Sequence, residues 1–139
     1  MKTSLKLSLA VALSGAGLAY ALPGSAHHSF ATEFDSRKPL LVEGVVTRFQ
    51  LVNPHSWIYL DVRNPDGTTT NWGFEFGTPL SLREHGITRQ AVAQGTKLRL
   101  SGFRAKNGGA FGYAAVVAFP DGHQVAIGSA PDAPALAIR

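Results

Sequence analysis

Histidine is the residue type in this 139-residue chain that offers the clearest chemistry. The chain has five histidines and no cysteine. His27 and His28 are adjacent, and His55 lies in the sequence Asn53-Pro54-His55-Ser56. A neutral imidazole is a good ligand for Cu(II), Ni(II) and Zn(II). Without thiolates, a metal site in this chain must be built from nitrogen and oxygen donors.

The segment before the histidines is typical of an export signal. Lys2 and Lys6 precede an apolar run over residues 7–22, which Pro23 and the small residues 24–26 follow. This pattern predicts a signal peptide over residues 1–26, with cleavage after Ala26 favoured over Ala21, and a periplasmic product. The run is shorter than the roughly 20 apolar residues of a membrane span, so no transmembrane segment is expected after signal removal.

Cleavage after Ala26 would make His27 the mature N-terminus. Its amine and ring nitrogen would then chelate one ion together, and His28 or His55 would add a second imidazole. Among first-row divalent metals, nitrogen donors of this kind bind Cu(II) most strongly, so copper is the favoured metal. The alternative is that the paired histidines are exposed polar residues on a flexible start, and that His55 is a turn residue.

Glu75 is the acidic residue best placed to support such a site. Aromatic residues flank it, and strand alternation puts its side chain on the opposite face from theirs. A carboxylate there would either bind a metal or orient a ligating histidine. The alternative is a surface glutamate paired with Arg48 or Arg63, which would contribute little to stability.

Outward-facing aromatic residues support a rival function. Trp57 and Tyr59 share one face of a predicted strand, and Trp72 lies on the next strand. Such rings could hold a protein or a glycan in the cell envelope without any metal. The alternative is that they pack against the N-terminal segment, through Phe30 and Phe34.

The pattern along the mature chain predicts an all-β fold with one short helix. Turn residues separate the β-rich runs, and a helix over residues 78–86 has a threonine cap and an early proline. Three strands, a helix and further strands favour a small OB-like barrel of five to six strands, with a sandwich as the competing fold. This domain would span residues 27–127, followed by a flexible tail over 128–139. The expected strands cover residues 40–51, 56–62, 68–76, 97–103, 111–119 and 123–127.

Charge and motifs exclude other classes of protein. The formal net charge is +4, and removal of Lys2 and Lys6 reduces it to +2, which is too small for a dedicated nucleic-acid binder. The chain has no nucleophile elbow, zinc-protease helix, phosphate loop or Rossmann glycine pattern. We therefore predict that the protein is not an enzyme.

Several of these motifs occur together in a known family. The sequences His27-His28-Ser29-Phe30 and Asn53-Pro54-His55-Ser56, in that order, and Trp72 with Glu75 carry the likeness. The chain resembles an uncharacterised family of small exported bacterial proteins, a domain of unknown function. The resemblance implies location and architecture rather than an activity, and it puts His28, His55 and Glu75 at motif positions.

Overall fold

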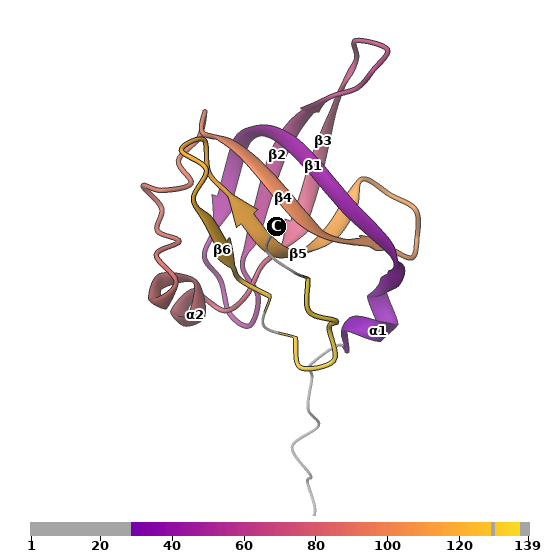
Figure 1. Cartoon of the computed structure of the whole chain (residues 1–139), viewed down its shortest axis with the longest axis vertical. Helices are drawn as coiled ribbons and strands as arrows, with labels where there is room; N and C mark the ends of the chain where they lie inside the picture. The colour runs from indigo at the N-terminus through magenta and orange to yellow at the C-terminus, as the bar shows by residue number, and fades with distance from the viewer. Residues whose placement is uncertain (1–28, 129, 137–139) are drawn as a thin grey trace, which may run out of the picture.

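The computed structural model describes residues 29–128 and 130–136, and Figure 1 shows its course. The predicted signal peptide over residues 1–26, and the candidate ligands His27 and His28, lie outside the described residues. No helix within the described part is long and apolar enough to cross a membrane. In chain order the elements are α1 (Phe30–Glu33), β1 (Phe34–Gln50), β2 (Trp57–Arg63), β3 (Thr69–Glu75), α2 (Pro79–Glu84), β4 (Lys97–Ala105), β5 (Phe111–Ala118) and β6 (Gln124–Ala126).

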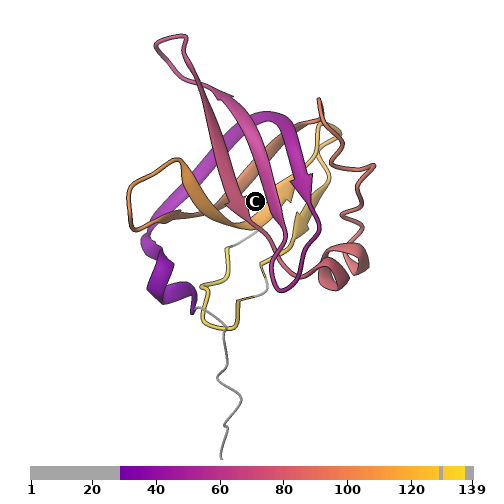
Figure 2. The ribbon, with the colours of Figure 1, turned by 180° about the vertical axis from the view of Figure 1, so that it is seen from behind.

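The six strands form one sheet in the order β3-β2-β1-β4-β5-β6. A parallel pairing between β3 and β5 closes the first five of these strands into a ring, which Figure 2 shows from behind. The all-β prediction is confirmed, including the helix between the third and fourth strands. Because all six strands belong to one sheet, the competing prediction of a two-sheet sandwich is wrong.

β1 is the longest strand, and it pairs with both β2 and β4. β1 begins at Phe34, six residues before the predicted start at Leu40. The prediction missed these residues because the pairing of β1 with β4 is irregular between Phe34 and Pro39, so the sequence there shows no regular alternation. Gly44 lies on β1 next to the point where this strand pairs with β2. A Cβ atom at this position would lie 2.6 Å from the backbone oxygen of Asp61, so the close approach requires glycine.

β2 shows the alternation that its sequence predicts. Ile58 and Leu60 are fully buried inside the ring, whereas Trp57 and Tyr59 are half-buried on its outer face. The predicted turn over residues 64–67 joins β2 to β3, and Gly67 takes the positive φ of +87° that the turn requires. This hairpin projects from the ring, as Figures 1 and 2 show.

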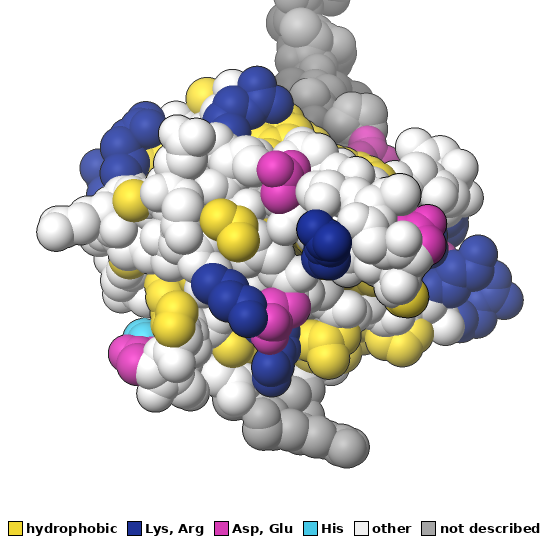
Figure 3. Space-filling view, turned by 90° about the horizontal axis from the view of Figure 1, so that it is seen from above, with side chains coloured by type: hydrophobic (Ala, Val, Ile, Leu, Met, Phe, Trp, Pro, Cys, Tyr) yellow, Lys and Arg dark blue, Asp and Glu magenta, His cyan; other side chains and the backbone are white. Residues whose placement is uncertain are grey.

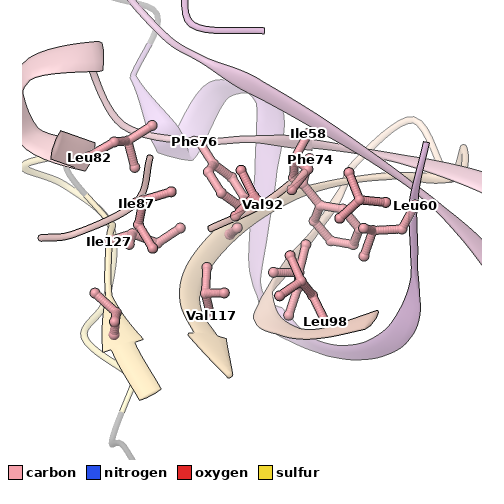
Figure 4. Packing of buried hydrophobic residues seen from close by; sticks show 14 of the residues in the cluster. Ile58, Leu60, Phe74, Phe76, Leu82, Ile87, Val92, Leu98, Val117 and Ile127 are labelled. Atoms are coloured by element: carbon pink, nitrogen blue, oxygen red, sulfur yellow. The ribbon is translucent and has the colours of Figure 1, made fainter. Parts of the chain in front are cut away.

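The inner core fills the ring with aliphatic side chains and two phenylalanines. Thr78 caps α2 by accepting a hydrogen bond from the Ser81 backbone N–H at 3.2 Å, and Leu82 then points into the core. The residues that follow α2 add further apolar groups at the same end of the ring, shown in Figure 4. The core includes Ile58, Leu60, Phe74, Phe76, Leu82, Ile87, Val92, Leu98, Val117 and Ile127.

A second cluster lies on the opposite face of β4 and β5. We call it the outer aromatic cluster, and its buried members are Phe30, Phe34, Phe103, Ala105, Tyr113, Ala115 and Val116. It contains α1, a second short helix, so the prediction of one helix is corrected. A four-residue helix carries no periodicity in its sequence. It forms here because the Phe30 ring packs edge-on against the rings of Phe103 and Tyr113, with centroids 5.3 and 5.2 Å apart.

Residues 130–136 lie against this outer aromatic cluster, within the tail that the sequence predicts to be flexible. The Tyr113 hydroxyl accepts a hydrogen bond from the Ala130 backbone N–H at 2.9 Å. Ala133 and Leu136 pack on the apolar side chains of the cluster. The two ends of the described chain therefore meet on one face of the ring.

The charged surface mixes both signs. Glu43 on β1 pairs with Lys97 and Arg99 on β4, at 2.7 and 3.1 Å. Figure 3 shows basic, acidic and small apolar patches interspersed over the face that it displays. Exposed pairs of this kind stabilise a fold little, and no single sign of charge dominates that face.

Candidate metal centre

The His55–Glu75 pair is the central feature of the candidate site. His55 Nδ1 lies 2.5 Å from Glu75 Oε1. Trp57, the first residue of β2, pairs with Glu75, the last residue of β3. Backbone hydrogen bonds of Ser56 with Gly77 and Phe76 extend this antiparallel pairing by one step. His55 therefore arrives on the same outer face of the sheet as Glu75.

Glu75 is buried, with 8% of the residue exposed. Its neighbours across the sheet are Trp57 on β2 and Tyr113 on β5, so large rings stand on both sides of the carboxylate. The alternative of a surface glutamate paired with Arg48 or Arg63 is wrong. The Arg48 guanidinium instead lies 3.9 Å from the centre of the Tyr59 ring.

Burial changes the acidity of this carboxyl group. It raises the pKa of Glu75 to about 7, and the nearby carboxylate of Glu33 at the end of α1 acts in the same direction. The 2.5 Å separation of Oε1 and His55 Nδ1 is a hydrogen-bond distance, so one of these two atoms must carry a proton and donate it to the other. When that proton is on the imidazole, Nδ1 donates to the carboxylate and Nε2 is the ring nitrogen that carries a lone pair.

This arrangement resembles the outer shell of a metal-bound histidine. A ligating histidine commonly donates its second ring N–H to a carboxylate, which fixes the ring orientation and makes the ligand more basic. The carboxylate role that the sequence analysis gave to Glu75, that of orienting a histidine, therefore has a matching contact. Its other role, direct ligation, would require Oε2, because Oε1 already faces the imidazole.

The described residues do not form a metal site by themselves. Within residues 29–128 and 130–136, no group of three or more His, Asp or Glu side chains is arranged to hold an ion. His55 and Glu75 come together, whereas His27 and His28 precede Ser29, the first described residue. A metal at His55 would need further donors from outside the described part of the chain.

The remaining two histidines lie apart from this pair. His85 is exposed, and its Nδ1 lies 2.7 Å from the Ser81 backbone oxygen at the end of α2. His123 is exposed and stacks on Phe119, with ring centroids 5.5 Å apart. Neither histidine contributes to the candidate site.

The three aromatic residues of the rival function are not brought together. Trp57 stacks on Phe111, with ring centroids 5.3 Å apart, and Phe111 in turn stacks on Phe34. Tyr59 lies beneath Arg48 on the same face. Trp72 is on the opposite face of β3, where it stacks on Phe74 at 5.9 Å.

Two residues near the site carry no signal in the sequence. Glu33 reaches Glu75 electrostatically because α1 packs on the outer aromatic cluster. Asp132 accepts hydrogen bonds from the backbone N–H groups of Phe30 and Ala31 across a separation of about a hundred residues. Neither contact follows from local spacing, since both depend on how the chain ends pack.

Fold and site together define a small all-β protein in which a five-strand ring carries a half-buried histidine paired with a buried glutamate on its outer face. The chain belongs to DUF6152, a family of unknown function, whose family model matches residues 16–114. The resemblance to a domain of unknown function is thus confirmed. No curated protein and no solved structure matched the chain in the corresponding comparisons.

Proposed function

We propose that this protein is exported to the periplasm and binds a transition metal there, with Cu(II) favoured. The ligands are His27, His28 and His55, and Glu75 orients the ring of His55. The observation that carries this proposal is the contact between His55 Nδ1 and Glu75 Oε1 on the outer face of the ring. Cleavage of the predicted signal peptide after Ala26 supplies the free amine of His27.

The burial of Glu75 supports the proposal that this carboxylate orients His55. A buried carboxylate is costly unless a hydrogen-bonded partner compensates it. The partner here is an imidazole whose side chain is still 26% exposed, so an ion from solvent has access to it. A metal on Nε2 would favour the form in which Nδ1 keeps its proton and donates to ionised Glu75.

The proposal requires the N-terminal histidines to reach His55 from the start of α1, and two contacts of the described residues support it. Phe30 packs against Tyr113, and Tyr113 is the backbone partner of Glu75 on the neighbouring strand. His28 is two residues before Phe30, and each extended residue spans about 3.3–3.6 Å. Three imidazoles and an amine form a nitrogen-rich set, for which Cu(II) has the highest affinity among the first-row divalent ions.

The test is a Cu(II) titration of the protein purified from periplasm, after its N-terminus is determined by mass spectrometry. Trp57 is the backbone partner of Glu75, so bound Cu(II) should quench its fluorescence, and a Trp72→Phe background isolates that signal. We expect one equivalent of Cu(II) to bind, and His55→Ala to weaken the affinity at least about 10-fold. The matched control is His123→Ala, an exposed histidine outside the site, which should leave the affinity unchanged.

Weak Cu(II) binding by the wild type, or an affinity that His55→Ala does not change, would contradict the metal proposal. The rival proposal of a metal-free envelope module would then gain support. It has less support at present, because Trp57, Tyr59 and Trp72 each already pack against another side chain of the same molecule. A glycan or protein partner would have to displace those contacts or add to them.

A further inference from the structure

We propose that the outer face of β1, β4, β5 and β6 carries a second binding groove, which takes a fatty acid. An apolar part of the groove holds the hydrocarbon chain, and two basic side chains beside it bind the carboxylate. We call this feature the lateral groove, and its main residues are Leu41, Glu43, Lys97, Arg99, Val116 and Leu136. It shares no residue with the His55–Glu75 pair, so this inference does not depend on metal binding.

The register of the four strands places a row of uncharged side chains across this face. Leu41 of β1 pairs with Ser101 of β4, Ser101 pairs with Val116 of β5, and Val116 pairs with Ala126 of β6. Directly paired residues of antiparallel strands lie on the same face of a sheet. Val116 belongs to the outer aromatic cluster, so the row lies on the outside of the ring. We call these four residues the apolar row.

A hollow of about 450 Å³ lies over the apolar row. Pro39, Leu40 and Leu41 of β1 line it together with Leu136 from the C-terminal segment. Leu41 is 66% exposed, more than any other large apolar side chain among the described residues. The volume falls within the roughly 300–1,000 Å³ of pockets that hold small molecules. A ligand in the hollow would therefore cover an apolar surface that is otherwise in contact with water.

The strands beneath the hollow offer no free edge to a peptide. β4 pairs with both β1 and β5, and β5 pairs with both β4 and β6 around Val116. A peptide that bound as an additional strand would need unpaired backbone N–H and C=O groups. A hydrocarbon chain needs none, because its binding is driven by the removal of apolar surface from water. The groove therefore favours an acyl chain over a peptide.

A second row of side chains supplies the charge. Glu43 and Arg99 are directly paired, and each lies two residues along its strand from the apolar row. Lys97 Nζ lies 2.7 Å from Glu43 Oε1, and Arg99 Nη2 lies 3.1 Å from Glu43 Oε2. Glu43 is the only acidic residue among the described residues that line the groove. Two cations thus share one carboxylate, which leaves one positive charge to attract an anionic ligand.

Arg99 connects the charged and apolar parts of the groove. It lines the hollow over the apolar row, and it also lines a neighbouring hollow of about 440 Å³ together with Glu43 and Lys97. Its guanidinium has five N–H donors, so it can bind a ligand carboxylate while it keeps its contact with Glu43. An apolar hollow with a cationic group at its side is complementary to a fatty acid in both shape and charge.

The experiment titrates the purified protein with laurate, below the concentration at which laurate forms micelles, and measures binding by isothermal titration calorimetry. Two further probes separate the parts of the ligand. Acetate has the carboxylate without the chain, and dodecyltrimethylammonium has the chain with the opposite charge. We expect one laurate to bind at least about 10-fold more tightly than dodecyltrimethylammonium, and acetate not to bind. The amide NMR signals of Val116 and Ala118 should shift as laurate binds.

Two variants test the two parts of the groove. Leu41→Glu places a charge beside the hydrocarbon chain and should weaken laurate binding at least about 10-fold. Arg99→Ala should remove the preference for laurate over dodecyltrimethylammonium. The matched controls are Leu80→Glu, at a leucine of α2 that is 59% exposed, and Arg89→Ala, at an exposed arginine after α2. Neither control residue lines the groove, so both variants should keep the wild-type affinity.

Three results would overturn the proposal. The first is equal affinity for laurate and dodecyltrimethylammonium, and the second is laurate binding that Leu41→Glu leaves unchanged. The third is the absence of laurate binding, including the case in which an apolar peptide with a free carboxyl terminus binds instead. None of these results bears on Cu(II) binding, and a failure to bind Cu(II) would leave the groove proposal standing. The two proposals therefore fail independently.

Discussion

The inner core and the outer aromatic cluster lie on opposite faces of the same strands, yet they are built differently. The inner core is mainly aliphatic and comes from strand residues at every second position, together with α2 and the residues after it. The outer aromatic cluster is dominated by rings, and it is completed by α1 and residues 130–136, from the two ends of the described chain. The inner core therefore forms as the strands close into the ring, whereas the outer aromatic cluster needs the two chain ends to pack on the ring.

This difference places the candidate site in a particular structural setting. His55 and Glu75 are fixed by the β2–β3 pairing, which shares its inner face with the core. The outer aromatic cluster beside them is completed by α1 and residues 130–136, which are attached by a few contacts. Segments with few buried contacts open locally at lower free energy than core strands do. The site thus combines a fixed pair of residues with neighbouring segments that detach more easily.

The strongest test of this comparison is Phe74→Ala in the inner core. Phe74 is fully buried, so the substitution removes a large apolar group from the centre of the ring. We expect the free energy of unfolding to fall by about 3–5 kcal/mol, measured by urea denaturation. Leu41→Ala is the control, because Leu41 is 66% exposed and its loss should change the stability by less than about 0.5 kcal/mol.

Phe30→Ala in the outer aromatic cluster should have a smaller effect, about 1–2 kcal/mol, although Phe30 is almost as buried as Phe74. The reason is that α1 can detach while the ring stays closed. Urea denaturation measures the loss, and amide exchange should accelerate in α1 but not in β2. A loss equal to that of Phe74→Ala would show that the two clusters unfold as one unit.

Glu75→Gln should give the smallest change, and one that depends on pH. The folded-state pKa of about 7 lies above the ordinary value of 4.5, so the folded protein binds more protons than the unfolded chain between these values. The contribution of Glu75 is therefore fully present below about pH 4.5 and is lost as the pH rises through about 7.

Thermal melts of the metal-free protein between these pH values would check this prediction. Wild type should lose about 1 kcal/mol relative to Glu75→Gln as the pH rises, a small figure because His55 and solvent offset much of the burial. Asp61→Asn, at an exposed position on β2, should follow the wild-type pH profile. Parallel profiles for wild type and Glu75→Gln would contradict the raised pKa.

Local sequence patterns predicted the strands, the turn and the helix that make up the ring. The alternation of Trp57, Ile58, Tyr59 and Leu60 gave the correct inner and outer faces, because a strand buried on one side must alternate. The turn before Thr68 and the capped helix after Thr78 followed from residues with defined backbone preferences. Each of these features depends on neighbours within a few positions of one another.

Contacts between residues far apart in the chain could not be predicted from the sequence. The sequence predicts that Glu75 either binds a metal or orients a histidine, and Glu75 does lie beside His55. Its burial, however, follows from the parallel pairing with Tyr113, which no local pattern encodes. α1 exists because Phe30 fits against two other rings and Asp132 caps it, not because its four residues favour a helix. Contacts between the chain ends are visible only in the tertiary structure, because no local sequence pattern indicates them.

The β2–β3 hairpin has a consequence for the order in which the protein folds. His55 and Glu75 flank one hairpin, so their contact needs no other strand. The ring closes when Phe111 of β5 meets Gly73 of β3, and Asp132 arrives from still farther along the chain. Contacts between nearby residues form sooner than those that close long loops. We therefore expect His55 and Glu75 to come together early in folding, and the chain ends that complete the outer aromatic cluster to arrive last.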